Sequence, residues 1–432
     1  MIRIENGFVV DPSQGVEGDF DLLIEAGRIK ALDRPGSFAG LTVSESFDAR
    51  GKVIVPGLID VHVHLREPGF EHKETVASGS RAAILGGFTS IAPMANTSPV
   101  NDHPLITEAI LHKARAAGQA RVFPIGAVTK GQKGVELAEI GLMARAGIRA
   151  ISDDGMPVMN SALMRRAMEY ARMFDLPVIS HAEDSNLSGG APMTEGAVSS
   201  LLGVSGNPNA SEEIMVAREI ALCRLTGARV HIAHLSTREG LEIVKRAKEA
   251  GLPVTAEVTP HHLLLDESSW LIGRHSCAHH QVRADYKMAP PLRSEQDREA
   301  LLHALNSGLI DMVASDHAPH GCVDKETEIE IAANGILGLQ TTVPLLLGLV
   351  NAKQMKLSRM VESLATAPAK LLGLQGLGTL KIGSHADLAV LDLNESWTLM
   401  PGDLVSKSGN TPFAGRTFQG KVLRTMVEGE WK

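Results

Sequence analysis

The sequence predicts an α/β protein: a (β/α)8 barrel with a small composite β-sandwich built from both ends of the chain. Three observations support this fold class. Apolar runs of four to seven residues alternate with longer amphipathic segments between residues 56 and 370. About eight such units occur, which matches the number and length of a barrel. The two ends of the chain instead contain short alternating segments separated by glycine turns.

The first 55 residues are expected to form one part of the sandwich. IRIENGFVV, DLLIEAGRIKAL and VSESFDARGKVIVPG follow one another with Gly7, Gly27 and Gly51 at the expected turns. Residues 371–432 have the same character, in HADLAVLDL, TLM and KVLRTMVEGEWK. Chain termini often lie close together, so we expect the two β segments to pair in one domain.

Residues 56–370 are expected to form the barrel. After VIVPGLIDVHVH the apolar, strand-like runs are FTSIAPM, RVFPIGAV, IRAISDD, PVISHAE, RVHIAHLS, PVTAEVTP and IDMVASDHAPH. Amphipathic segments such as SALMRRAMEYARMF and REGLEIVKRAKEAG separate several of them. Continuous apolar strands followed by helices indicate a parallel sheet covered on both faces. A doubly wound open sheet is the alternative, and eight units within about 315 residues favour a closed barrel.

Composition excludes several classes of protein. The 432 residues are 44% hydrophobic and 21% charged, and their net charge of −8 argues against general binding of nucleic acid. No run reaches the roughly 18 apolar residues of a membrane span, and the N-terminus lacks the pattern of a signal peptide. The three cysteines have no paired spacing and are expected to be reduced. These features predict a soluble cytoplasmic protein.

Polar residues stand where the predicted barrel strands end. In GLIDVHVHLREPG, His62 and His64 are one residue apart and therefore share a face of their strand. Asp153 and Asp154, then His181, His234 and Asp316, follow later strands. A single histidine at a strand end is more often a hydrogen-bonded structural residue than a ligand. Asp153 and Asp154 are alternatives for one position, so four histidines and two aspartates at one end of a barrel predict a metal centre, and their number favours two ions.

The remaining histidines are interpreted less specifically. HSCAHH (275–280) is predicted to be a surface loop, and His103, His112 and His303 are predicted to be structural. His261 and His262 follow VTAEVTP at a strand end, so one of them is a candidate to line the site.

At these residues the chain resembles the amidohydrolase superfamily and, within it, the dihydroorotase family. DVHVHLREPG (60–69) and ASDHAPHGCVDK (314–325) are similar to the two signatures of that family. The motifs between and after them fall in the family's order: MANTSP, SDDG, SHAED, AHLSTREG, VTPHHLLLDE, PPLR and SKSGNTPFAGR. The resemblance covers essentially the whole chain. It implies a metal-dependent hydrolase barrel that interconverts N-carbamoyl-L-aspartate and L-dihydroorotate in pyrimidine biosynthesis.

The resemblance also implies a role for each site residue. His62, His64, His181, His234 and Asp316 would be metal ligands, with Asp154 in the bridging position that other subgroups fill with a carbamylated lysine. The choice of Asp154 over Asp153 remains open at this point. Asp316 would be the catalytic acid and base beside a metal-bound hydroxide, and Arg66, Asn96 and His320 would bind the substrate. Two Zn²⁺ ions per subunit are expected, with one as the alternative. A homodimer and a complex with aspartate transcarbamoylase are the expected partners.

Three positions depart from the family's pattern. Ala95 stands in place of a usual proline, Gln340 in place of a common glutamate, and Ala289 in place of a substrate-binding asparagine. The alternatives are a related cyclic-amide hydrolase of the hydantoinase, dihydropyrimidinase or allantoinase type, and a non-catalytic partner of aspartate transcarbamoylase. Arg66 favours a substrate with a carboxylate, and the complete set of ligands disfavours the non-catalytic alternative.

Overall fold

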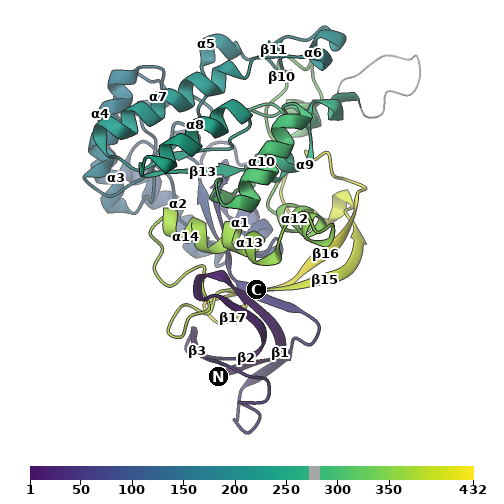
Figure 1. The fold of residues 1–432 in the computed structure, drawn as a ribbon. Coiled ribbons are helices and arrows are strands. Elements are labelled where there is room, and N and C mark those ends of the chain that lie inside the picture. The colour runs from purple at the N-terminus through teal and green to yellow at the C-terminus, as the bar shows by residue number, and fades with distance from the viewer. Residues whose placement is uncertain (272–282) are drawn as a thin grey trace.

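The chain forms a closed parallel barrel, seen in a computed structural model that describes residues 1–271 and 283–432 (Figure 1). One part of the ring pairs β6, β7 and β8, and the other pairs β9, β12, β13 and β14. Isolated bridges close the ring, from Gly126 to Ile151 to Val178 on one side and from Val63 to His317 on the other. Ile151 thus takes the place of the fourth strand, so the eight-membered barrel predicted from the sequence is confirmed. The strands are β6 (Leu58–Val63), β7 (Phe88–Pro93), β8 (Arg121–Val122), β9 (Val178–Ser180), β12 (Val230–Ile232), β13 (Val254–Val258) and β14 (Met312–Val313).

Helices connect the strands and surround the barrel (Figure 1). Several begin at side chains that accept hydrogen bonds from the first turn: Thr75 and Ser294 form capping boxes, and Thr237 caps through Gly240 N. The helices that follow successive strands are α1 (Val76–Leu85), α2 (Pro104–Ala117), α3 (Ile140–Ala146), α4 (Ser161–Arg172), α7 (Ala210–Thr226), α8 (Arg238–Glu249), α10 (Glu295–Ser307) and α12 (Thr342–Asn351). The last part of the barrel layer contains α13 (Leu357–Val361), a π-helical turn at Glu362–Thr366 and α14 (Ala367–Leu371).

Short elements occupy the connections beyond the carboxyl ends of the strands. They are α5 (Ser185–Ser188), β10 (Met193–Thr194), α6 (Ala197–Leu202), β11 (Gly206–Asn207), α9 (Pro260–Leu264) and α11 (Cys322–Lys325). Figure 1 shows α5, α6, β10 and β11 together at the end of the barrel that lies away from both chain termini.

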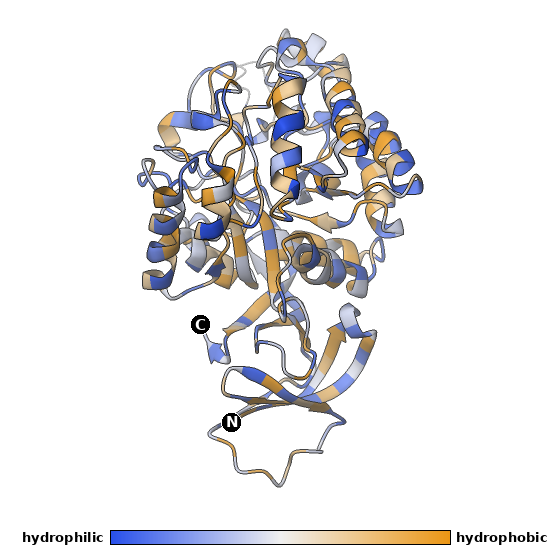
Figure 2. Ribbon diagram, turned by 90° about the vertical axis from the view of Figure 1, so that its left-hand side faces the viewer, coloured by the Kyte–Doolittle hydropathy of each residue, from blue (hydrophilic) through white to orange (hydrophobic). Residues whose placement is uncertain are grey.

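Two apolar clusters hold the barrel together, and Figure 2 shows hydrophobic residues on the barrel strands. Small and branched side chains of the strands form a separate buried cluster that includes Ile59, Val61, Ala92, Ile179 and Met312. A larger cluster lies between the outer faces of the strands and the helices. Continuous burial of both strand faces explains why the strand sequences are apolar without alternation.

The two ends of the chain build one β domain, as predicted. A single eight-stranded sheet has the order β17-β16-β15-β5-β1-β2-β3, with β4 paired to β1. β5 pairs in parallel with β1 and antiparallel with β15, so it joins the N-terminal strands to the C-terminal strands. The strands are β1 (Ile2–Asp11), β2 (Val16–Glu25), β3 (Arg28–Asp33), β4 (Glu45–Asp48), β5 (Val53–Pro56), β15 (Leu388–Thr398), β16 (Thr417–Val427) and β17 (Glu430–Trp431).

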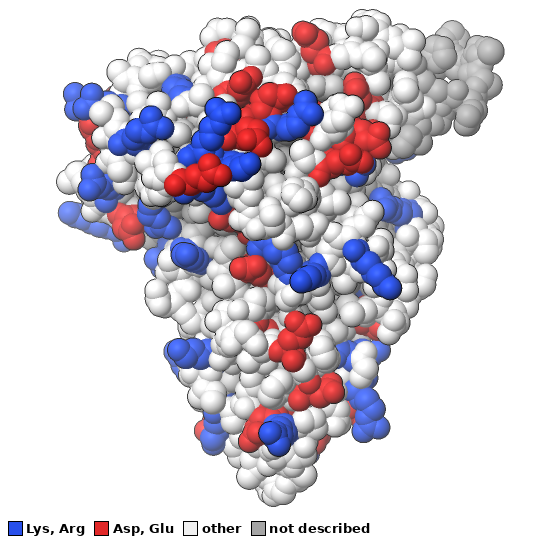
Figure 3. Space-filling model, viewed as in Figure 1, with Lys and Arg blue, Asp and Glu red and all other residues white. Residues whose placement is uncertain are grey.

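The surface carries both signs of charge. On the face drawn in Figure 3, Lys and Arg are interspersed with Asp and Glu over most of the molecule. Such a mixed surface offers no extended basic patch on this face for a polyanion. Among the described residues, the helices are all too short or too polar to cross a bilayer.

Candidate metal centre

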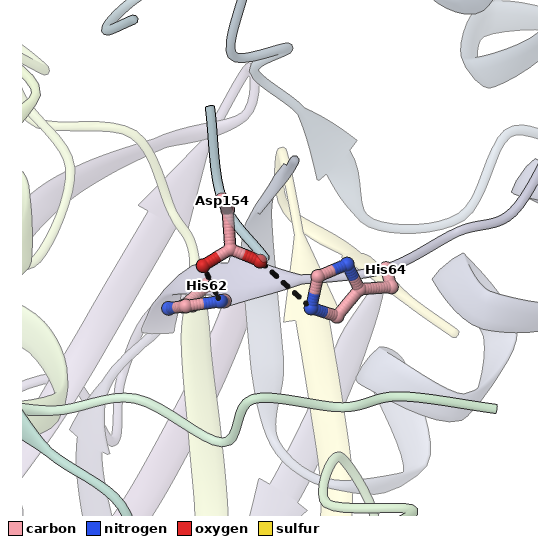
Figure 4. A group of neighbouring side chains, drawn as sticks. All are labelled: His62, His64 and Asp154. Atoms are coloured by element: carbon pink, nitrogen blue, oxygen red, sulfur yellow. Dashed lines mark ion pairs between the residues drawn. The ribbon is translucent and has the colours of Figure 1, made fainter. Parts of the chain in front are cut away.

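Residues from separate strands converge on Asp154 at the carboxyl end of the barrel. His62 and His64 approach from β6, and Figure 4 shows their rings on either side of the Asp154 carboxylate. Their Nε2 atoms lie 3.4 Å from Oδ1 and 3.5 Å from Oδ2 of Asp154. Asp316, which follows β14, places its Oδ1 3.0 Å from His64 Nε2 and 3.5 Å from His62 Nε2. All four side chains are buried.

His181 and His234 complete the cluster on the other side of Asp154. They follow β9 and β12, and their Nδ1 and Nε2 atoms lie 3.7 and 3.6 Å from Asp154 Oδ1. The same two nitrogens are 2.9 Å apart. Ligands at about 2.0–2.1 Å from a tetrahedral ion are roughly 3.3 Å from one another, so these spacings match the edges of a coordination shell. The six residues that the sequence singled out therefore lie together, and Asp154 is common to both groups of three.

Two buried atoms of the cluster have no hydrogen-bond partner among the described residues: His62 Nε2 and Asp154 Oδ1. A buried polar atom without a partner is costly, and a bound cation is one way of satisfying it. The donors are imidazole nitrogens and carboxylate oxygens, which suit Zn²⁺ and other borderline divalent ions. The residues present therefore fit a metal centre.

Hydrogen bonds behind the cluster fix which nitrogen of His62 and of His64 faces inward. His62 Nδ1 donates to Glu257 Oε1 at 2.6 Å, so Nε2 is the nitrogen that faces Asp154 and Asp316. His64 Nδ1 donates to Asn96 Oδ1 at 2.9 Å with the same consequence. Carboxylate and amide partners of this kind orient metal-binding histidines and raise their basicity. Asn96, predicted to bind substrate, thus also orients a ligand candidate.

The two neighbouring aspartates have different surroundings. Asp153 accepts hydrogen bonds from Val128 N at 2.7 Å and Thr129 N at 3.1 Å, and also from the Thr129 hydroxyl. It is therefore occupied in holding the loop after β8. Asp154 accepts no backbone hydrogen bond from the residues that the structure describes, and it faces the four histidines. This geometry favours Asp154 over Asp153 as the bridging carboxylate.

The electrostatics of the cluster favour a cation. Burial alone would lower the pKa of His62, but Asp154, Glu257 and Asp316 raise it well above its ordinary value. Burial would likewise raise the pKa of Asp316, and the histidines around it, His62 first, hold that pKa below its usual range instead. A positive charge on His62 thus compensates the ionised carboxylates, and a bound metal ion would supply that charge in place of the ring proton.

The backbone is strained at three of the predicted site residues. Arg66, His234 and Asp316 have φ angles of 61°, 32° and 49°. Non-glycine residues in this region cost of the order of 1–3 kcal/mol each and persist where the surrounding structure holds them in place. At these three residues the strained backbone directs the side chains towards the cavity beside the cluster.

Arg66 and His320 lie on one wall of a cavity of about 800 Å³ that opens onto the cluster. Arg66 Nη2 is 3.0 Å from His320 Nε2, and Arg66 Nε donates to Pro319 O. Asn96 and Ala289 also line this cavity. The structure therefore brings all three predicted substrate-binding residues to the same space as the metal cluster, and Ala289 contributes a methyl group there.

Gln340 and Ala95, the other two departures from the family pattern, lie outside this cavity lining. The Gln340 amide bonds to Asp403 O and Val405 N in the C-terminal segment. The Ala95 carbonyl accepts from Thr97 N and Asn101 N within its own loop.

The candidates His261 and His262 are buried but do not line the cavity. His262 accepts from the Thr259 hydroxyl and donates to Pro290 O, which is a structural role. Burial lowers the pKa of His261 to about 4, so it stays neutral. The HSCAHH segment lies outside the described residues.

Sequence reasoning missed Glu257 and its partner His231. Glu257 is fully buried in β13, where it accepts from His62 and, through Oε2, from His231 Nε2 at 3.0 Å. Asp60 was missed too; its carboxylate accepts from Ser315 N and His62 N and so ties β6 to the residues after β14. The available signal was a carboxylate within the apolar runs PVTAEVTP and GLIDVHVH.

We expect Glu257→Gln to weaken metal binding about 10–100-fold, because the amide loses the charge that makes His62 a strong donor. Metal retained after dialysis against graded concentrations of chelator measures this change. Glu219→Gln, which removes another buried carboxylate whose partners are Arg218 and Ser180, is the matched control. Equal metal retention by the Glu257 variant and the parent would contradict the assignment.

The fold and the site define a metal-dependent amidohydrolase. Residues 53–432 match the Amidohydrolase family, and the chain belongs to that family. Within it, the chain belongs with the dihydroorotases. It is 47% identical over 433 residues to the dihydroorotase of Anaeromyxobacter dehalogenans strain 2CP-1, covering 99% of this chain and 97% of the relative. It is also 47% identical to the dihydroorotase of Solibacter usitatus, covering 100% and 97%.

Solved structures support the same fold. L-Hydantoinase (dihydropyrimidinase) from Arthrobacter aurescens matches with a TM-score of 0.86 at 27% identity, over 100% of this chain and 95% of that one. D-Hydantoinase (dihydropyrimidinase) from Thermus sp. matches with a TM-score of 0.82 at 24% identity, with the same coverage. The second similarity, at this identity, speaks to the fold alone.

Proposed function

We propose that the protein is a zinc-dependent dihydroorotase that catalyses the reversible cyclisation of N-carbamoyl-L-aspartate to L-dihydroorotate. The observation that carries the proposal is the pair formed by Arg66 and His320 on the wall of the cavity that reaches the histidine cluster. A substrate carboxylate can accept hydrogen bonds from both residues while the ring amide lies over the cluster. Similarity at 47% identity to relatives named dihydroorotases supports the same activity.

The residues that would hold the metal are His62, His64, His181, His234, Asp154 and Asp316. Two ions are favoured because Asp154 has one oxygen towards His62, His181 and His234 and the other towards His64. When bound, zinc supplies a Lewis acid for the carbonyl and acidifies water near neutral pH.

Asp316 would transfer the proton between the nucleophile and the ring nitrogen. Its carboxylate lies at the edge of the cluster and lines the cavity, so it can take a proton from the nucleophile and return it to the leaving ring nitrogen. In the direction of cyclisation it would accept the proton of the ureido nitrogen as that nitrogen attacks the side-chain carboxylate, and would pass that proton to the departing carboxylate oxygen, which leaves as hydroxide. Arg66 and His320 would hold the other carboxylate, and Asn96 would keep His64 oriented.

The substrates of the related cyclic-amide hydrolases provide the test, because hydantoin and dihydrouracil lack the carboxylate that L-dihydroorotate carries. We expect the zinc-loaded protein to hydrolyse L-dihydroorotate with a kcat/KM at least 10³-fold above that for hydantoin or dihydrouracil. Loss of ultraviolet absorbance measures each reaction. A preference for either neutral ring would overturn the proposal in favour of the hydantoinase type, and turnover of none would favour the non-catalytic alternative.

The homodimer, the complex with aspartate transcarbamoylase and the cytoplasmic location stay predictions. Mixing the purified protein with the transcarbamoylase and measuring mass by light scattering tests the first two.

A further inference from the structure

The ring of His320 lies between two cationic side chains. Arg66 Nη2 is 3.0 Å from its Nε2, and Lys73 Nζ is 3.4 Å from its Nδ1. Lys73 is anchored by Asp324 Oδ1 at 3.1 Å, and the other oxygen of Asp324 accepts from Gly321 N. The His320 backbone N–H donates to Asn410 Oδ1 at 3.0 Å. The position of the His320 ring is therefore fixed by contacts at both ring nitrogens and at the backbone N–H.

This arrangement offers two donors to a ring that can accept only one hydrogen bond. Guanidinium and ammonium groups only donate, whereas a neutral imidazole has a lone pair on one nitrogen and a proton on the other. His320 is neutral, because burial, Arg66 and Lys73 lower its pKa to about 2. Without an anion, one of the two contacts must place a donor against a donor. The shorter distance is that to Arg66, so the lone pair of the free ring belongs on Nε2.

An anion reverses this preference. A carboxylate only accepts, so His320 can bind one only if its Nε2 carries the proton. The lone pair then moves to Nδ1, where Lys73 is the cation within hydrogen-bond distance among the described residues. Arg66, released from Nε2, can donate to the same carboxylate. The substrate would thus relieve the conflict by separating the two donors.

We propose that Lys73 is a positioning residue that selects the Nε2–H tautomer of His320 in the substrate complex, so that His320 and Arg66 both donate to the substrate carboxylate. The inference rests on the proposed function, since it concerns how that substrate is held. Lys73 does not touch the substrate and acts through the lone pair that it accommodates on Nδ1.

The experiment is a double-mutant cycle of Lys73→Met and His320→Gln, with steady-state kinetics on L-dihydroorotate. Lys73→Met is expected to raise KM at least tenfold and to change kcat less than threefold, because the chemistry at the cluster is untouched. Lys73→Arg, which keeps a donor, should restore KM to within threefold of the parent. A glutamine amide donates without a tautomer, so Lys73→Met should change KM less than twofold in the His320→Gln background.

Lys113→Met is the matched control: Lys113 lies in α2, pairs with Glu67 of the loop that contains Lys73, and makes no contact with His320. It should leave KM unchanged. A KM within twofold of the parent for Lys73→Met, or the same rise in both backgrounds, would overturn the inference. The same rise in KM in both backgrounds would mean that Lys73 acts only through its positive charge and not through the tautomer of His320.

Calorimetric binding of L-dihydroorotate and N-carbamoyl-L-aspartate separates this inference from the proposed function. If the parent protein binds either compound without turnover, the proposed function is overturned. The double-mutant cycle of Lys73→Met and His320→Gln is then measured with Kd in place of KM, and the same fold-changes are expected. A parent that binds neither compound overturns both.

Discussion

Asp316→Asn should lower kcat for L-dihydroorotate by about 10³-fold or more while the fold and the metal content stay close to those of the parent. The amide keeps an oxygen towards His64 and His62 but cannot accept and return a proton at the reacting atoms. Turnover and metal content measured on the same preparation test this prediction.

Asp311→Asn is the control for that variant. Asp311 lies just before β14, at the opposite end of the strand, and pairs with Lys248 at 2.6 Å. Its replacement should alter stability and leave kcat unchanged. If Asp316→Asn kept kcat within tenfold of the parent at full metal occupancy, Asp316 would not be the acid and base.

Asp154→Ala should abolish stable metal binding and, with it, turnover. One carboxylate is common to all four histidines, so its removal takes a ligand from both halves of the cluster. Four histidines without the bridging charge hold two cations poorly, because the repulsion between the ions is no longer offset. Metal content after gel filtration is the measurement.

Asp153→Ala is the matched variant and should behave differently. Its three hydrogen bonds hold residues 128 and 129, so we expect a loss of about 2–4 kcal/mol in the free energy of unfolding with metal content retained. The reverse pattern, in which Asp153→Ala loses metal and Asp154→Ala keeps it, would place the bridge at Asp153.

The fold and the cluster were accessible from the sequence for a simple geometric reason. Parallel strands of a closed barrel end at one face, so the polar residues at the strand ends had to lie together once the alternation of strands and helices was recognised. These residues are His62, Asp154, His181, His234 and Asp316. The period of two along β6 likewise set His62 and His64 on one side. Both arguments need only the local sequence pattern and the rule that the parallel strands of a closed barrel end at the same face.

The supporting contacts were not accessible in this way. Glu257 and His62 are 195 positions apart, and Lys73 and His320 are 247 apart, so nothing local indicates that they touch. Whether Asp153 or Asp154 faces inward depends on the turn after Ile151, where the backbone N–H groups of Val128 and Thr129 donate to the Asp153 carboxylate. Such details follow from three-dimensional packing, which a single strand pattern does not encode.

Metal-dependent turnover of L-dihydroorotate is the most direct test of the central claim. The protein would be stripped with chelator, assayed, and then titrated with Zn²⁺ while bound metal and turnover are followed together. We expect no turnover by the stripped protein and recovery that reaches a plateau at two ions per chain. Full turnover by the stripped protein, or stoichiometric zinc binding at the cluster with no turnover of L-dihydroorotate, would contradict the account.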